Sequence, residues 1–171
     1  KCEVVFNKVR VPKANILGRP DQGWWIVEVI IAQSVLALCP WMVGGAQQAL
    51  DMAVSYAKER VQFDRPIGSF QAIQHKCANI AIDVAAARDI TYETAWKLEQ
   101  GLPCKKEISI AKAWVSEAYR KACAEGIQIH GGIGITADHD VQLYYRRAKA
   151  MEIAFGDADY HLELAAREMG L

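Results

Sequence analysis

The sequence lacks an excess of charge of either sign, and it has no internal repeat and no low-complexity segment. Its 171 residues contain 20 lysines and arginines against 20 aspartates and glutamates, so the net charge is zero. A general nucleic-acid or membrane-surface binder depends on a basic surface, which this balance does not favour. The sequence therefore predicts neither nucleic acid nor a membrane as a partner.

The chain also lacks paired cysteines. Its five cysteines are scattered, odd in number and without a C-x-x-C pair. Such a set does not form a disulfide framework, and it indicates buried free thiols in a reducing compartment. No secretory signal is visible, so we expect a protein that is not secreted. The four histidines have no metal-ligand spacing, and no metal site is predicted.

One long apolar stretch, residues 29–46, is long enough to raise the question of a membrane span. Glu28 borders it, and Gln33, Ser34 and Pro40 interrupt it. This pattern favours a buried core helix. The five tryptophans are likewise expected to be core residues rather than a stacking platform.

Apolar residues recur every three or four positions along three long segments, which is the period of an amphipathic helix. The three stripes are Cys39, Val43, Ala46, Leu50, Ala53 and Ala57; Ile73, Cys77, Ile80, Val84 and Ala87; and Ile108, Ala111, Val115, Ala118 and Ala122. A fourth helix is expected to begin near Asp138 or Asp140, with a short last helix between Gly156 and Gly170. We predict an all-α fold, an antiparallel up-and-down four-helix bundle with a short extra C-terminal helix. Before the bundle, residues 4–11 are rich in β-branched residues and predict a strand.

Two short segments carry residues suited to holding a ligand. In YAKERVQF, residues 56–63, Arg60 could bind a phosphate and Phe63 could pack on a flat ring system. The alternative is a solvated arginine at a helix C-terminus and an ordinary core phenylalanine. In IQIHGGIGIT, residues 127–136, three glycines let the backbone approach a ligand, or they simply stop a helix. This segment follows a helix and is not G-x-G-x-x-G, which excludes a Rossmann site.

Taken together, four motifs resemble the acyl-CoA dehydrogenases in their order and spacing. The motifs are VRVPKANILG (9–18), YAKERVQFDRPIGSFQAIQ (56–74), GIQIHGGIGIT (126–136) and YYRRAK (144–149). The resemblance spans nearly the whole chain. It implies that residues 1–22 are the end of a β-domain with a linker, and that residues 23–171 are the family's C-terminal helical bundle.

The resemblance also implies a cofactor and partners. In the family, a glycine loop packs against FAD that is bound across a subunit interface, and an arginine and a phenylalanine meet FAD from the other side. The matching residues are Gln128, Gly131, Gly132 and Gly134 in the loop, then Arg60 and Phe63, with Gln71 in a further matching segment. The implied substrate is an acyl-CoA of fatty acid metabolism, and the implied electron acceptor is an electron-transfer flavoprotein. A homodimer, homotetramer or hetero-oligomer is expected, in the bacterial cytoplasm or the mitochondrial matrix.

The chain departs from the family pattern at the catalytic base, the carboxylate that removes the substrate α-proton. Most members have a glutamate where this chain reads A-F-G-D, so Phe155 occupies that position. The base position of a second group of members corresponds to Ser34. Glu152 and Asp157 are the candidate substitutes nearby. Three hypotheses follow. The chain is an enzyme with a relocated base or with a base from a partner chain, a non-catalytic subunit that completes a partner's FAD site, or a helical interaction module without flavin.

Overall fold

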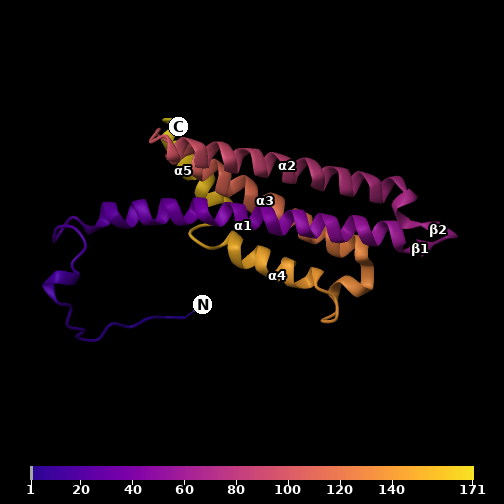
Figure 1. The fold of residues 1–171 in the computed structure, drawn as a ribbon, viewed down its shortest axis with the longest axis horizontal. Coiled ribbons are helices and arrows are strands. Elements are labelled where there is room, and N and C mark those ends of the chain that lie inside the picture. Colours follow the sequence, from indigo (N-terminus) through magenta and orange to yellow (C-terminus); the bar gives the residue numbers. More distant parts are fainter. Residues whose placement is uncertain (1) are drawn as a thin grey trace.

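The computed structural model describes residues 2–171, and almost all of its regular structure is helical (Figure 1). The helices are α1 (Gly23–Glu59), α2 (Gln71–Glu99), α3 (Lys105–His130), α4 (Val141–Glu152) and α5 (Ala158–Glu168). The short elements are η1 (Lys13–Asn15), β1 (Val61–Gln62), β2 (Arg65–Pro66), η2 (Ile67–Ser69) and η3 (Gly131–Ile135). The helices α1 to α4 run alternately in opposite directions, and α5 packs against α3. This arrangement confirms the predicted four-helix bundle with its short extra helix.

The core of the bundle lies where the predicted apolar stripes meet. The stripes on α1 and α3 are buried along their whole length, and α2 contributes Ile80, Val84 and Ala87. Many of these core residues are alanines, which let the helix axes approach closely. The most extensive packing is between α1 and α3, and α2 and α4 complete the bundle around this pair.

Residues 2–22 do not form the predicted strand. They run as an extended segment with one short 3₁₀ turn, and the β-branched side chains predicted for the strand are exposed. A strand is stable only when its backbone groups bond to a neighbouring strand. The only ladder in residues 2–171 is the two-residue pairing of β1 with β2, so no described strand lies beside residues 4–11. The division into residues 1–22 and 23–171 stays a prediction.

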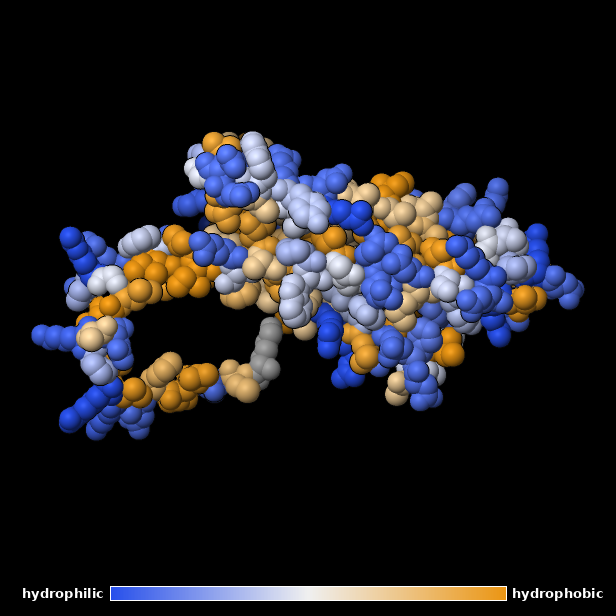
Figure 2. Space-filling model, viewed as in Figure 1, coloured by the Kyte–Doolittle hydropathy of each residue, from blue (hydrophilic) through white to orange (hydrophobic). Residues whose placement is uncertain are grey.

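The first third of α1 also differs from expectation, because it stands outside the core. Figure 2 shows apolar side chains gathered over the N-terminal tail and the start of α1. All five tryptophans are 47–70% exposed, so their assignment to the core was wrong: Trp24, Trp25, Trp41, Trp96 and Trp114. Among residues 2–171, α1 is long and apolar enough to cross a membrane by length and composition. A core helix meets the same criteria, and the residues of α1 from Val35 to Ala57 that point inward are buried in the bundle.

The connection between α1 and α2 is a two-residue hairpin turn in an unfavourable backbone conformation. Val61 pairs with Pro66 and Gln62 pairs with Arg65, which leaves Phe63 and Asp64 at the tip. Both have positive φ, 54° and 62°. Turns of this kind normally carry Asn-Gly or Asp-Gly, because glycine has no Cβ to clash.

We therefore expect Asp64→Gly to stabilise the intact protein by roughly 0.5–1 kcal/mol, because it relieves this backbone strain. The measurement is the free energy of unfolding in denaturant. Asp51→Gly is the matched control, since Asp51 is exposed but lies within α1, where glycine weakens a helix. A loss of stability in both variants would contradict the prediction.

Candidate functional site

The glycine segment at the end of α3 is shaped by two of its three glycines. Gly131 caps α3 with φ 65° and ψ −140°, a conformation that side-chain-bearing residues rarely adopt. A Cβ on Gly134 would lie 3.0 Å from the Ile127 carbonyl oxygen, so the turn packs on the helix it follows. At Gly132, by contrast, a Cβ would meet nothing within 4 Å. The fold of this chain does not require a glycine there, and the open surface leaves room for an external group.

The α1–α2 connection presents the other predicted site residues. Arg60 is the C-cap of α1, and its backbone N–H donates to the Tyr56 carbonyl at 2.8 Å. The Arg60 guanidinium is exposed and makes none of the ion pairs found among the described residues. Phe63 is 87% exposed, which contradicts the alternative of an ordinary core phenylalanine. Gln71 is the first residue of α2 and is exposed.

These two segments lie at the same end of the bundle, to the right in Figure 1. Tyr56, one turn before Arg60, stacks on His130 at the end of α3 with ring centroids 4.6 Å apart. His130 in turn contacts His139 in the loop before α4, at 4.5 Å. The Gln128 side chain is exposed beside this cluster. The sequence-predicted flavin residues therefore gather at one end, around an aromatic cluster in which His130 is buried and Tyr56 and His139 are half-buried.

Phe155 lies elsewhere, in the turn between α4 and α5. Its φ is 59°, and its side chain is 49% exposed. A bulky residue in the left-handed region costs of order 1–3 kcal/mol and persists only where its surroundings hold it. The Phe155 backbone N–H bonds to no other group of residues 2–171. The turn thus offers a free N–H donor next to a phenyl ring, at the position that the sequence resemblance predicts for the family's base.

The two candidate substitutes for the base already have structural partners. The Glu152 carboxylate is mostly buried and forms an ion pair with Lys149 at 2.9 Å. Asp157 is the N-cap of α5, and its Oδ1 accepts a hydrogen bond from the Tyr160 N–H at 3.0 Å. Ser34 is partly buried on α1. These contacts explain both acidic residues without a role in proton abstraction.

Lys112 is a residue that sequence reasoning missed. It lies on α3 and is fully buried, at 0% exposure. Its Nζ donates to the carbonyl oxygens of Glu152 and Gly156 at 2.8 and 3.0 Å, and to Ser116 Oγ at 3.1 Å. Burial lowers the pKa of the Lys112 ammonium below its usual range. A lysine next to an apolar stripe usually extends its ammonium to solvent, so the sequence gives little sign that Lys112 is buried. The one signal is Ser116, a possible hydrogen-bond partner one helical turn later.

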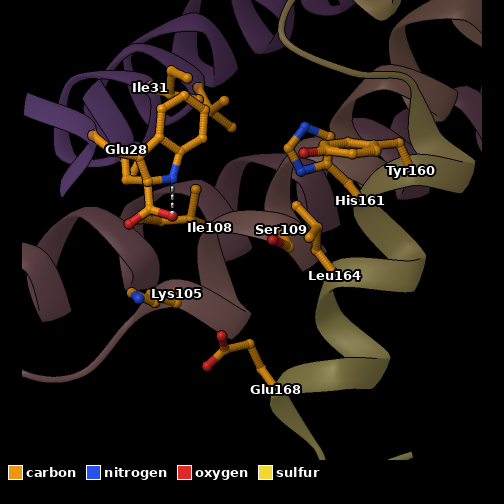
Figure 3. A pocket seen from close by; sticks show the side chains of 12 residues that line it. Glu28, Ile31, Lys105, Ile108, Ser109, Tyr160, His161, Leu164 and Glu168 are labelled. Atoms are coloured by element: carbon orange, nitrogen blue, oxygen red, sulfur yellow. Dashed lines mark hydrogen bonds between the residues drawn. The ribbon is translucent and has the colours of Figure 1, made fainter. Parts of the chain in front are cut away.

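His161 on α5 holds the same turn and also lines a pocket of about 290 Å³ between α1, α3 and α5 (Figure 3). Its Nε2 lies 3.0 Å from the Phe155 carbonyl oxygen. Because a carbonyl only accepts, Nε2 carries the proton. In Figure 3 the His161 ring lies over Ser109, and Glu28 and Ile31 approach from α1. Phe155 itself does not line the pocket.

The buried histidines make the stability of the fold sensitive to acid. Burial lowers the pKa of both His130 and His161 below 6.5. The unfolded chain therefore binds more protons than the folded chain as the pH falls through 6.5 towards the two folded values. We expect the unfolding free energy to fall over this window, by up to about 1.4 kcal/mol per pH unit for each histidine.

Unfolding in denaturant at a series of pH values measures this dependence. His130→Phe keeps a ring against Tyr56 but cannot titrate, so its slope should be shallower. His75→Asn is the control, because His75 is exposed and should not change the slope. A wild-type curve that is flat between pH 6.5 and 5 would contradict the prediction.

The geometry agrees with comparisons to known proteins. A family model described as "Acyl-CoA dehydrogenase, C-terminal domain" matches residues 21–170. The chain belongs to this family. Among its relatives are the probable acyl-CoA dehydrogenase YngJ of Bacillus subtilis and the mitochondrial short/branched chain specific acyl-CoA dehydrogenase of Bos taurus. The first is 40% identical over 98% of this chain and 44% of its own length, and the second is 37% identical over 97% and 38%.

Solved acyl-CoA dehydrogenases have the same helical domain. The butyryl-CoA dehydrogenase of Megasphaera elsdenii superposes with a TM-score of 0.94 at 32% identity, over 98% of this chain and 44% of the solved one. The chain thus spans less than half the length of the relatives it matches. It is an acyl-CoA dehydrogenase C-terminal helical domain, as the four sequence motifs indicated.

Proposed function

We propose that this chain is the FAD-binding and oligomerisation domain of a flavoprotein that acts on acyl-CoA thioesters. The observation that carries this proposal is the gathering of Arg60, Phe63 and the glycine segment at one end of an acyl-CoA dehydrogenase bundle. The same gathering argues against a helical interaction module without flavin.

The residues present fit FAD. The unpaired Arg60 guanidinium suits a pyrophosphate, with which it can form charge-assisted hydrogen bonds. The exposed Phe63 ring suits a flat ring system, and it packs edge to face with the Phe70 ring, with centroids 6.1 Å apart. Gly132 offers open backbone where the fold itself does not require a glycine. We assign Gln71 and Gln128 to the same surface. When bound, FAD accepts the hydride that leaves the β-carbon of an acyl-CoA.

The acyl-CoA side of the proposal rests on the Phe155 turn. The free N–H of Phe155 can donate to the thioester carbonyl oxygen and stabilise the negative charge that develops there when the α-proton leaves. No carboxylate occupies position 155 or position 34 to take that proton. Glu152 and Asp157, the candidate substitutes, are held by Lys149 and by the α5 N-terminus. We therefore expect this chain to bind and polarise a thioester with little base catalysis of its own.

A second candidate function follows from the lack of a carboxylate at positions 155 and 34. The chain is a non-catalytic subunit that completes the FAD site of a partner carrying a base. Phe155 favours it, because the turn keeps its N–H donor while a phenyl ring replaces the carboxylate. Under either hypothesis we expect a homodimer, homotetramer or hetero-oligomer, with an electron-transfer flavoprotein as acceptor. We place the protein in the bacterial cytoplasm or the mitochondrial matrix; one relative is bacterial, and another has "mitochondrial" in its name.

The test is an absorption spectrum of the intact purified protein, recorded before and after adding a panel of saturated acyl-CoAs. Flavin absorbance that co-purifies with the protein and shifts on adding a thioester would support FAD and acyl-CoA binding. Bleaching by the protein alone would indicate a working base, and bleaching only after adding a base-containing homologue would indicate the non-catalytic subunit. A flavin-free protein that does not take up FAD would overturn the proposal.

A further inference from the structure

Two buried side chains hold the turn between α4 and α5 from inside the bundle. Lys112 donates to the carbonyl oxygens of Glu152 and Gly156, and His161 donates to that of Phe155 between them. Lys112 is 0% exposed and His161 is 3% exposed. Three carbonyl oxygens within five consecutive residues are therefore fixed by two donors that belong to α3 and α5.

Ending a helix does not require two buried donors from other helices. A glycine in the left-handed region suffices to stop a helix and to satisfy its last carbonyls. Here Gly156 has a positive φ of 102°, but Phe155 before it also has one, 59°, and a residue with a side chain needs support from its surroundings in that conformation. Lys112 provides that support from 40 residues earlier in the chain, and Ser116 orients its ammonium. The position of the turn is thus tied to the core of the bundle rather than to the local sequence.

Fixing these carbonyls also restricts the backbone N–H of Phe155, which lies between Glu152 and Gly156 in the same turn. The Phe155 N–H shares a planar peptide unit with the Ala154 carbonyl, and this unit lies between the held carbonyls of Glu152 and Phe155. Holding the backbone on both sides of this unit restricts the direction of the N–H. That N–H has no partner in residues 2–171. A preorganised donor stabilises developing charge better than one that must first be ordered.

We propose that Lys112 is a positioning residue, which holds the α4–α5 turn so that the Phe155 N–H can donate to the carbonyl oxygen of a bound acyl thioester. His161 is the second support of the same turn. This inference rests on the proposed function, because it presupposes a thioester at this turn.

The experiment uses the intact, FAD-loaded protein and the variant Lys112→Met, which fills the same volume but has no donor. The first readout, without ligand, is amide hydrogen exchange at Ala154, whose N–H donates to the Met151 carbonyl oxygen at 3.2 Å in the same turn. The second is the infrared carbonyl band of bound butyryl-CoA, isotopically labelled at the thioester carbon. Lys121→Met is the matched control, since Lys121 is an exposed lysine on the same helix that pairs with Asp83.

We expect exchange at Ala154 to rise by roughly ten- to a hundred-fold in Lys112→Met, because the turn loses a charged donor that holds it in place. The carbonyl band should move back towards its position in free butyryl-CoA. Lys121→Met should change neither readout. Unchanged exchange, or faster exchange with an unmoved band, would overturn the positioning role. A wild-type protein that binds no butyryl-CoA or longer thioester would instead overturn the proposed function, and the positioning role with it.

A second pair of variants keeps the test decisive if Lys112→Met does not fold. His161→Gln retains a side-chain N–H for the Phe155 carbonyl, and His161→Met does not. We expect the carbonyl band to stay near its wild-type position in His161→Gln and to move in His161→Met. The same band position in both would overturn the proposal.

Discussion

Phe155→Glu should create or raise dehydrogenation of saturated acyl-CoAs, by a factor on the order of 10²–10⁴, the usual contribution of a general base. The backbone of the turn already places residue 155 in its left-handed conformation, with a free N–H beside it. Glutamate is unbranched at Cβ, as phenylalanine is, so the turn need not change to accept it. A partly desolvated carboxylate there would have a raised pKa, which suits it to taking a weakly acidic proton.

The measurement is flavin reduction by a panel of acyl-CoAs, with folding and FAD content checked in each protein. Phe155→Gln is the matched control: it has nearly the same shape as the glutamate but cannot take a proton, so it should stay inactive. Robust turnover by the wild type that disappears in Asp157→Asn or Glu152→Gln would show a relocated base. Equal, low rates in well-folded Phe155→Glu and Phe155→Gln would mean that residue 155 does not face the substrate.

Arg60→Ala should weaken FAD binding by roughly ten- to a hundred-fold, the usual effect of losing a charge-assisted hydrogen bond. The Arg60 side chain has no carboxylate partner in the described residues, so it is free to bind a phosphate. Arg60→Lys should rescue binding only in part, because lysine lacks the planar pair of donors that matches a pyrophosphate.

FAD dissociation constants of the intact protein, measured by titration of the flavin-free form, test this expectation. Lys58→Ala is the control, because Lys58 is an exposed cation in the last turn of the same helix. Equal losses in both variants would show a general electrostatic effect. An unchanged affinity in Arg60→Ala would return this arginine to the role of a solvated residue at a helix end.

The sequence predicted the bundle well because its signals are local. The stripe from Cys39 to Ala57 repeats at the helical period, and a 3.6-residue period leaves little choice of secondary structure. The strand at residues 4–11 could not be settled in the same way, since a strand depends on a neighbour that its own residues do not specify. The prediction that the tryptophans lie in the core was wrong for a related reason. Hydrophobicity alone does not show whether a large side chain faces the core of its own domain or another surface.

The site was predictable only in part. The residues predicted to bind FAD follow from the resemblance, because they occur in short motifs with fixed spacing, and their role stays a prediction. Lys112 could not, since its three acceptors lie 4, 40 and 44 residues away and come together only in the folded chain. The strain at Phe155 was equally hidden, because nothing in A-F-G-D says that the phenylalanine takes a positive φ together with the glycine after it.

The exposed tryptophans give this chain a built-in optical reporter. Indoles in contact with water fluoresce at longer wavelength than indoles in an apolar contact, and every tryptophan of the sequence is at least 47% exposed. Trp24 and Trp25 stand at the start of α1, Trp41 lies farther along it, and Trp96 and Trp114 stand on α2 and α3. Any surface that covers one of these places should shift the emission to shorter wavelength. Single tryptophan-to-phenylalanine replacements would then tell which face of the bundle is covered.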